Sequence, residues 1–122
     1  MKKDPLVFVK HISDEIEKVE RFSKDLTKDQ LKKNELKQYA IIRAIEIIGE
    51  AVNNIPKEVK RKYSEVSWID ISGMRNKLIH HYFGINLNIV WKTIKEDIPD
   101  LKQKILKIKN DLEEKEKLEK KE

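Results

Sequence analysis

Hydrophobic residues recur at helical spacing from the start of the chain. From Asp4 onward they follow one another at intervals of three and four residues, which predicts an amphipathic helix to about residue 24. Pro5 would occupy the first helical position, where a missing N–H leaves no hydrogen bond unmade. The apolar stripe of this helix consists of Leu6, Val9, Ile12, Ile16, Val19 and Phe22.

A second and denser apolar stripe follows. Thr27 and Gln30 have the spacing of a capping box, which predicts that a helix begins there. The same helix is expected to run to Val52 and to end in the segment 53–56. From Tyr39 to Val52 it is apolar on more than one face, so it should lie at the centre of a bundle. Its apolar positions are Leu31, Leu36, Tyr39, Ala40, Ile42, Ala44, Ile45, Ile47, Ile48, Ala51 and Val52.

Two further helices are predicted in the middle of the chain. A short basic helix covers residues 56–63, and Ser67 is placed to cap another helix from Trp68 to Phe83. Asp70 would lie in the first turn of that second helix, and Gly84 would stop it.

The last part of the pattern is also helical. Asn86 or Asn88 is expected to cap a helix, which Pro99 breaks or restarts. An amphipathic stripe then continues from Leu101 to Leu112. The pattern therefore predicts an all-α fold, an up-down bundle of four to five main helices. We expect one helical domain over residues 1–112 and a charged tail over residues 113–122.

Composition narrows the possibilities further. Only three Gly and three Pro occur, too few for the many turns of an all-β fold, and the absence of Cys excludes disulfides and thiolate metal sites. No apolar run approaches the length of a membrane span, and the N-terminus does not read as a signal peptide. We expect a soluble cytoplasmic protein. The net charge of +5 permits a nucleic-acid partner without requiring one.

The candidate chemistry is concentrated between Trp68 and Phe83. If that segment is one helix advancing about 100° per residue, Arg75, Asn76 and His80 lie on a face beside the apolar one. An arginine fork grips phosphate oxygens, and a histidine can accept or give a proton near neutral pH. Arg75 and His80 would thus suit RNA cleavage without a metal, with Asn76 orienting either group or the substrate.

Such a reaction also needs a donor for the leaving oxygen. The candidates are His81, Tyr82, or the same residues from a second copy across a dimer cleft. No metal site or cofactor is expected, because adjacent histidines point about 100° apart on a helix and no third ligand is evident. A purely structural role for Arg75 and His80 remains the alternative, since structural ion pairs are common.

These residues carry a resemblance to a known family. The run from Arg75 to Tyr82 fits the Arg-x4-His-x-Tyr motif of the HepT-like branch of the HEPN superfamily. The segment 44–51 resembles the family's second-helix signature. Trp68, the groups 73–75 and 80–84, Val90-Trp91 and the segment 97–101 follow in the family's order. The resemblance covers residues 5–110.

The resemblance implies a helical HEPN fold that forms a homodimer, with the motif helices of two protomers facing a shared cleft. It also implies a metal-independent RNase toxin, paired with a small nucleotidyltransferase antitoxin of the MNT type. Arg75 and His80 would be catalytic, and Tyr82 would be the site at which the antitoxin attaches AMP. For the interface we favour residues 42–51 together with the motif helix, with Gly49 allowing close approach.

Two other functions stay open from the sequence. The chain could be a non-catalytic nucleotide- or RNA-binding partner of a nucleotidyltransferase, in which Arg75 binds phosphate and His80 only donates a hydrogen bond. It could also be an interaction protein whose motif is an internal polar network. A flat pH–activity profile with binding but no turnover would favour the first, and a neighbouring nucleotidyltransferase gene would count against the second.

Overall fold

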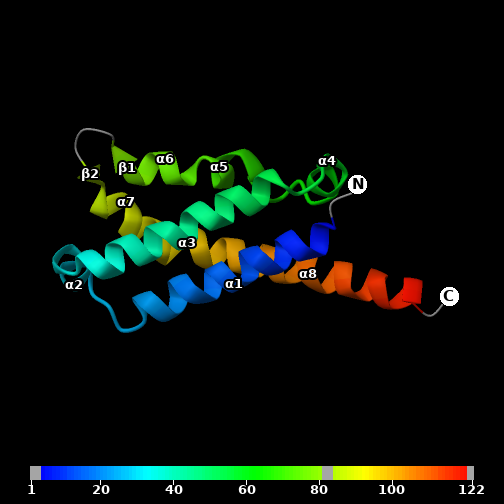
Figure 1. Cartoon of the computed structure of the whole chain (residues 1–122), viewed down its shortest axis with the longest axis horizontal. Coiled ribbons are helices and arrows are strands. Elements are labelled where there is room, and N and C mark those ends of the chain that lie inside the picture. The colour runs from blue at the N-terminus through cyan, green and yellow to red at the C-terminus, as the bar shows by residue number, and fades with distance from the viewer. Residues whose placement is uncertain (1–3, 81–83, 121–122) are drawn as a thin grey trace.

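Three long helices form the body of the protein. The structure, a computed structural model, describes residues 4–80 and 84–120 (Figure 1). The long helices are α1 (Pro5–Ser23), α3 (Glu35–Asn53) and α8 (Ile98–Lys120). α1 packs against both α3 and α8, and the core between them is built from fully buried side chains such as Ile12, Ile45 and Ile105. The short helices α5 (Trp68–Ser72) and α6 (Met74–Leu78) pack on the other side of α3.

The remaining elements are short. They are α2 (Lys28–Lys33), α4 (Lys57–Lys62), α7 (Leu87–Lys92), a π-helical turn η1 (Thr93–Asp97), and the two-residue strands β1 (Ile79–His80) and β2 (Gly84–Ile85). The all-α class is confirmed. The expected four to five main helices are wrong for the described residues, where three helices are long and the others are short. No helix in this part of the chain is long and apolar enough to cross a membrane.

The predicted helix starts are confirmed where a side chain caps the backbone. The Asp4 carboxylate accepts from the Leu6 N–H at 3.0 Å, with Pro5 as the first residue of α1. Thr27 and Gln30 form the capping box of α2, and Asn86 caps α7 by accepting from the Ile89 N–H.

The helix expected to run unbroken from residue 28 to residue 52 is instead divided. The Asn34 side chain accepts from the Lys37 N–H at 3.0 Å, so a new helix begins at Glu35. Leu36 and Tyr39, expected in the apolar stripe, lie seven and four residues before the exposed Arg43 and share its face of α3. They are 80% and 59% exposed.

The motif helix predicted from Trp68 to Phe83 is wrong in its extent. Gly73 separates α5 from α6, and the helix ends at Leu78, because Ile79 takes an extended backbone with φ −122° and ψ 124°. β1 then pairs antiparallel with β2, with His80 opposite Gly84, and the Asn86 N–H donates to the Leu78 carbonyl at 2.8 Å. The helical angle between Arg75 and His80 that the sequence suggested does not apply.

Pro99 does not interrupt the helical path. The N–H of Ile98 donates to the carbonyl of Thr93, five residues back, so one extra residue fits into the turn before α8. Pro99 itself has no N–H to donate and is accommodated at the second position of α8. α8 then continues across the boundary placed at residue 112, which stays a prediction, and residues 113–120 are helical.

Tyr63 ties the middle of the chain to α8. Its hydroxyl donates to Asp111 Oδ2 at 2.9 Å, and its carbonyl accepts from the Trp68 indole N–H at 3.1 Å. Tyr63 is only 4% exposed. Burial, and after it the hydrogen bond and charge of Asp111, raises the pKa of Tyr63 to about 12.

The raised pKa predicts a loss of stability in alkali. Tyr63 is neutral when protonated, and its pKa is higher in the folded chain than the ordinary value of 10.0. Its contribution to the free energy of unfolding is therefore complete below pH 10 and is lost as pH rises toward about 12. We expect urea unfolding to show a smaller fall in stability between about pH 9 and about pH 11 for Tyr63→Phe than for the wild type. An equal fall in both proteins would contradict this account of Tyr63.

Candidate functional site

Arg75 projects from α6 toward the neighbouring helix α3. Its Nε donates to Glu46 Oε2 at 2.8 Å, and the two side chains are 47% and 24% exposed. A guanidinium carries five N–H donors, and this bond uses one of them. Glu46 therefore orients a permanently charged group while leaving donors on the terminal nitrogens for another partner. Arrangements of this kind suit the recognition of a phosphate or carboxylate.

Close packing of α3 against the α5–α6 junction places this pair. A Cβ added to Gly49 would lie 3.2 Å from the Ser72 carbonyl oxygen, tighter than ordinary contact, so a larger residue would require this backbone to shift by a few tenths of an ångström. The prediction that Gly49 allows close approach at a dimer interface stays a prediction, and within the chain the close neighbour of Gly49 is the backbone of α5. On α6, Met74 and Leu78 are buried against the core, which leaves Arg75 on the exposed side.

The other candidate residues are described to different extents. Asn76 follows Arg75 on α6 with an exposed side chain, and its N–H donates to the Gly73 carbonyl at 3.1 Å. The backbone of His80 lies in β1, two residues after α6 ends, but its side chain is not among the described ones. His81 and Tyr82 lie outside the described residues. The structure thus shows Arg75 and Asn76 together and leaves the positions of the His80 and Tyr82 side chains as predictions.

Glu46 is the residue that sequence reasoning missed. It stands inside the segment 44–51 that carries part of the family resemblance, but nothing in that segment indicates a partner 29 residues away. The signal available in the sequence was the position of Glu46 in the apolar part of α3, where an unpaired carboxylate is unusual.

The apolar surface expected at a dimer interface is largely used inside the protomer. Ile42, Ala44, Ile45, Ile48 and Ala51 are all buried in the core of a single chain. The outer face of α3 presents mostly polar side chains near the pair, and Arg43 Nη1 lies 3.6 Å from Glu50 Oε1. An interface on α3 would therefore involve charged groups more than the apolar residues named from the sequence.

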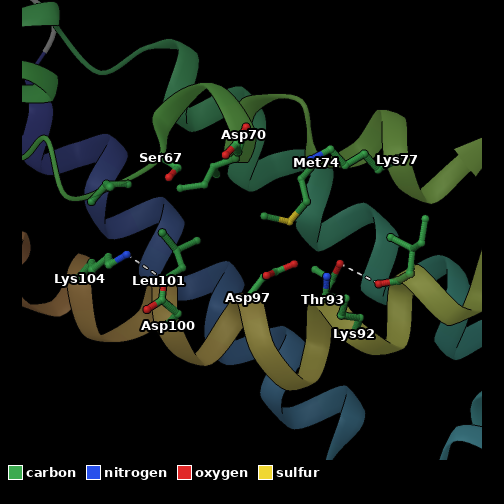
Figure 2. Close-up of a pocket in the computed structure, with 13 residues that line it drawn as sticks. Ser67, Asp70, Met74, Lys77, Lys92, Thr93, Asp97, Asp100, Leu101 and Lys104 are labelled. Atoms are coloured by element: carbon green, nitrogen blue, oxygen red, sulfur yellow. Dashed lines mark hydrogen bonds and ion pairs between the residues drawn. The ribbon is translucent and has the colours of Figure 1, made fainter.

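A separate cavity lies on the other side of α6. It has a volume of about 380 Å³ and runs between α5–α6 and the path from α7 through η1 to α8 (Figure 2). Met74 points into it from α6, and Asp97 points into it from η1. Asp70, Asp100 and Lys104 line it as well, and Lys104 is paired with Asp100. Neither Arg75 nor Asn76 lines this cavity, so it is distinct from the candidate site.

Comparisons with known proteins identify a family for the chain. Residues 12–108 match the family described as ribonuclease HepT-like. A Methanocaldococcus jannaschii protein named "Gamma-glutamylcyclotransferase and putative RNase" is 43% identical over 113 residues, which cover 93% of this chain and 51% of that protein. A Thermococcus cleftensis protein named "Probable ribonuclease HepT" is 42% identical over 109 residues, covering 89% of this chain and 99% of that protein.

A third relative has a similar name. A Caldanaerobacter subterraneus protein named "Putative RNase" is 42% identical over 106 residues, covering 87% of this chain and 95% of that protein. The chain spans about half the length of the first relative and nearly the whole length of the other two. No solved structure matches the chain.

The fold and the site define a small all-α protein that presents an arginine oriented by a carboxylate. With the match over residues 12–108, this chain belongs to the HepT-like ribonuclease family.

Proposed function

We propose that this chain is a metal-independent RNA endonuclease and the toxin of a toxin–antitoxin pair. The observation that carries the proposal is the exposed Arg75, whose Nε is held at 2.8 Å by Glu46 while other guanidinium N–H groups remain for a phosphate. His80 follows two residues after the end of α6, close enough in the chain to serve the same substrate. The names of the relatives, which refer to RNases, support the same reaction class.

The proposed reaction uses a hydroxyl of the RNA itself. His80 takes the proton of a ribose 2′-OH, and the oxygen attacks the adjacent phosphorus as Arg75 stabilises the charge that builds on the phosphoryl oxygens. The bond from phosphorus to the 5′ oxygen breaks, and that oxygen receives a proton from an acid. The products are a 2′,3′-cyclic phosphate and a 5′-OH end. Asn76, which is exposed and follows Arg75 on α6, would orient the substrate.

The acid is best supplied by a second copy of the chain. A two-fold arrangement brings the same surface of two protomers together, so each motif segment would face the other across a cleft. Exposed apolar residues on the elements flanking Arg75 support such a contact, because Ile69 on α5 is 86% exposed and Tyr39 on α3 is 59% exposed. We therefore infer a homodimer with a shared cleft.

Regulation by a small nucleotidyltransferase antitoxin completes the proposal. Attachment of AMP to Tyr82 would add phosphate charge a few residues from Arg75 and compete with RNA for its guanidinium. Incubation with the antitoxin and ATP should raise the mass of the chain by AMP increments and abolish cleavage, while Tyr82→Phe should stay unmodified. If the antitoxin abolishes cleavage while the wild-type chain stays unmodified, the proposed regulation through Tyr82 is wrong.

The direct test of the function is cleavage of RNA in EDTA. RNA should be cut, and DNA of the same sequence should remain intact because it lacks the attacking 2′-OH. A wild-type chain, shown by mass to be unmodified at Tyr82, that leaves RNA intact would contradict the proposal. Equal cleavage of RNA and DNA would contradict the proposed nucleophile.

Glu46 is a positioning residue in this account. Glu46→Ala should lower kcat by about 10- to 100-fold, because a misplaced Arg75 no longer meets the phosphate. Glu46→Gln keeps a hydrogen-bond acceptor for Arg75 Nε, so it should recover most of the rate. The melting temperature should change little, since exposed ion pairs contribute about 0.2–1 kcal/mol. If both variants lose activity equally, Glu46 acts through its charge and not by orienting Arg75.

A further inference from the structure

Helix α4 lies at one end of the molecule (Figure 1) and is rich in basic residues. The sequence of α4 is KEVKRK, with four basic residues and one acidic residue. Lys57, Arg61 and Lys62 are exposed. Within the described residues none of them takes part in an ion pair. Exposed and unpaired cations of this kind are available to an anionic partner.

Two of these cations, Lys57 and Lys62, line a groove that also has apolar lining residues. The groove has a volume of about 730 Å³ and lies where α4 meets the end of α3, the start of α1 and the outer part of α8. Lys57, Lys62 and Lys115 line it. The apolar lining residues include Ile55, Val59 and Leu112. Such a volume is within the range of small-ligand sites, which are mostly apolar with a few placed polar groups.

The polar groups of the groove suit a nucleotide. The ammonium of Lys62 lies 5.6 Å from the centre of the Tyr63 ring, and both residues line the groove. The Asn53 side chain also lines the groove, and an amide can both donate to and accept from a base edge. The acidic residues present are Glu58 and Asp111, and Asp111 is engaged by the Tyr63 hydroxyl. The lysines that line the groove would contact phosphates, while its apolar lining residues would contact the face of a base.

The groove is placed to extend the candidate site along one helix. Glu46, which holds Arg75, and Asn53, which lines the groove, are both on α3. Seven residues separate positions 46 and 53, or about 10 Å along the helix axis. A stacked strand has one phosphate per about 3.4 Å, so a single strand at Arg75 needs at least about three nucleotides to reach the groove.

We propose that the α4 groove binds single-stranded RNA of the substrate at a distance of several nucleotides from the bond that is cut. This inference rests on the proposed RNase function, and it adds a surface that selects for strand length. An RNA too short to span from Arg75 to Lys57 would forgo these contacts. The phosphate contacts would make binding of longer strands sensitive to salt.

The test measures binding of 2′-O-methyl RNA, which cannot be cut because it lacks the free 2′-OH. The probes are a labelled strand of about 16 nucleotides and one of about two, which is shorter than the span of about three nucleotides from Arg75 to the groove. The groove variant is Lys57→Gln, Lys62→Gln and Lys115→Gln together. The matched control is Lys24→Gln, Lys32→Gln and Lys33→Gln, which removes the same charge from exposed positions at the α2 end of the molecule. Circular dichroism establishes that all the proteins are folded.

For the longer strand, the groove variant should raise Kd several-fold and reduce the slope of log Kd against log salt by about 2, or about 0.7 per lost contact. The control variant should leave that slope nearly unchanged, and the short strand should bind similarly to all three proteins. Equal losses in the groove and control variants would overturn the inference. AMP competing as well as the long strand, or polyglutamate binding with the same dependence on these lysines, would also overturn it.

Failure of this inference and failure of the RNase function are distinguishable. Normal cleavage of RNA by the wild type, with an unchanged salt slope in the groove variant, would overturn the inference alone. Absence of cleavage, with the expected loss of slope in the groove variant, would overturn the RNase function and support the groove as an RNA-binding surface.

Discussion

Replacing Arg75 with alanine is expected to lower the rate of RNA cleavage by about 10²–10³-fold, which is typical for removal of one group that stabilises transition-state charge. Arg75 is the described residue best placed for this role, because Glu46 fixes its Nε and the side chain is still 47% exposed. Arg75→Lys keeps the charge but loses the planar fork, so it should recover only part of the rate. Single-turnover cleavage of a defined RNA measures the effect.

The structure offers a matched control for this substitution. Arg43 is also exposed and also faces a carboxylate, with its Nη1 3.6 Å from Glu50 Oε1. Arg43→Ala removes the same charge and should leave the rate within a few-fold of wild type. Both variants should melt close to the wild type, because exposed ion pairs contribute about 0.2–1 kcal/mol. A rate that falls equally in the two variants would indicate general electrostatics and would contradict the assignment of Arg75.

Replacing His80 with alanine is expected to lower the rate by about 10²–10⁴-fold and to change its pH dependence. If His80 is the base, activity in the wild type should rise as the imidazole loses its proton, near the ordinary histidine pKa of about 6.5. If the partner copy supplies an imidazolium as the acid, activity should fall again at higher pH, giving a bell-shaped profile. The residual rate of His80→Ala should not show this bell-shaped dependence on pH.

His11 provides the control for the histidine substitution. It is exposed on α1, where its ring meets the edge of Phe8 at 6.1 Å between centroids. His11→Ala should retain both the rate and the bell-shaped profile. A wild-type profile that rises without a maximum to about pH 10 would contradict a reaction that uses two histidines.

Local signals in the sequence predicted the helix starts well. The side chains of Asp4, Thr27 and Asn86 cap their helices by accepting from backbone N–H groups two or three residues ahead. Because both partners are close in the chain, the local sequence is enough to predict these helix starts. Two positions differ from the prediction. Ser67 precedes α5 as expected, but its side chain makes no capping hydrogen bond. Asn34 caps a new helix where the apolar pattern on both sides of it suggested one continuous helix.

The end of the motif helix could not be predicted from helical periodicity. Helical spacing placed Arg75 and His80 on one helix, but the helix ends at Leu78 because Ile79 turns into a strand that pairs with β2. That pairing depends on Gly84, whose φ of +77° suits glycine, and on the Asn86 N–H reaching the Leu78 carbonyl. Neither contact has a helical period, so the pattern could not reveal it.

Contacts between distant residues were the least predictable part of the site. The Arg75–Glu46 pair joins positions 29 residues apart, and Gly49 lies close to the Ser72 carbonyl where α3 meets the same segment. The sequence indicated the chemistry of Arg75 and the small size of Gly49, but not that the two belong to one arrangement. The apolar residues of segment 42–51 likewise indicated burial without showing that the burial is within one chain.

The most direct test of the central claim is the identity of the ends left by RNA cleavage in EDTA. Wild type, Arg75→Ala and His80→Ala should be compared on one RNA, with the products analysed by mass. The account predicts 2′,3′-cyclic phosphate and 5′-OH ends from the wild type, with both variants nearly inactive. Products with 3′-OH ends, or equal cleavage by all three proteins, would contradict the claim that Arg75 and His80 promote attack by the 2′-OH.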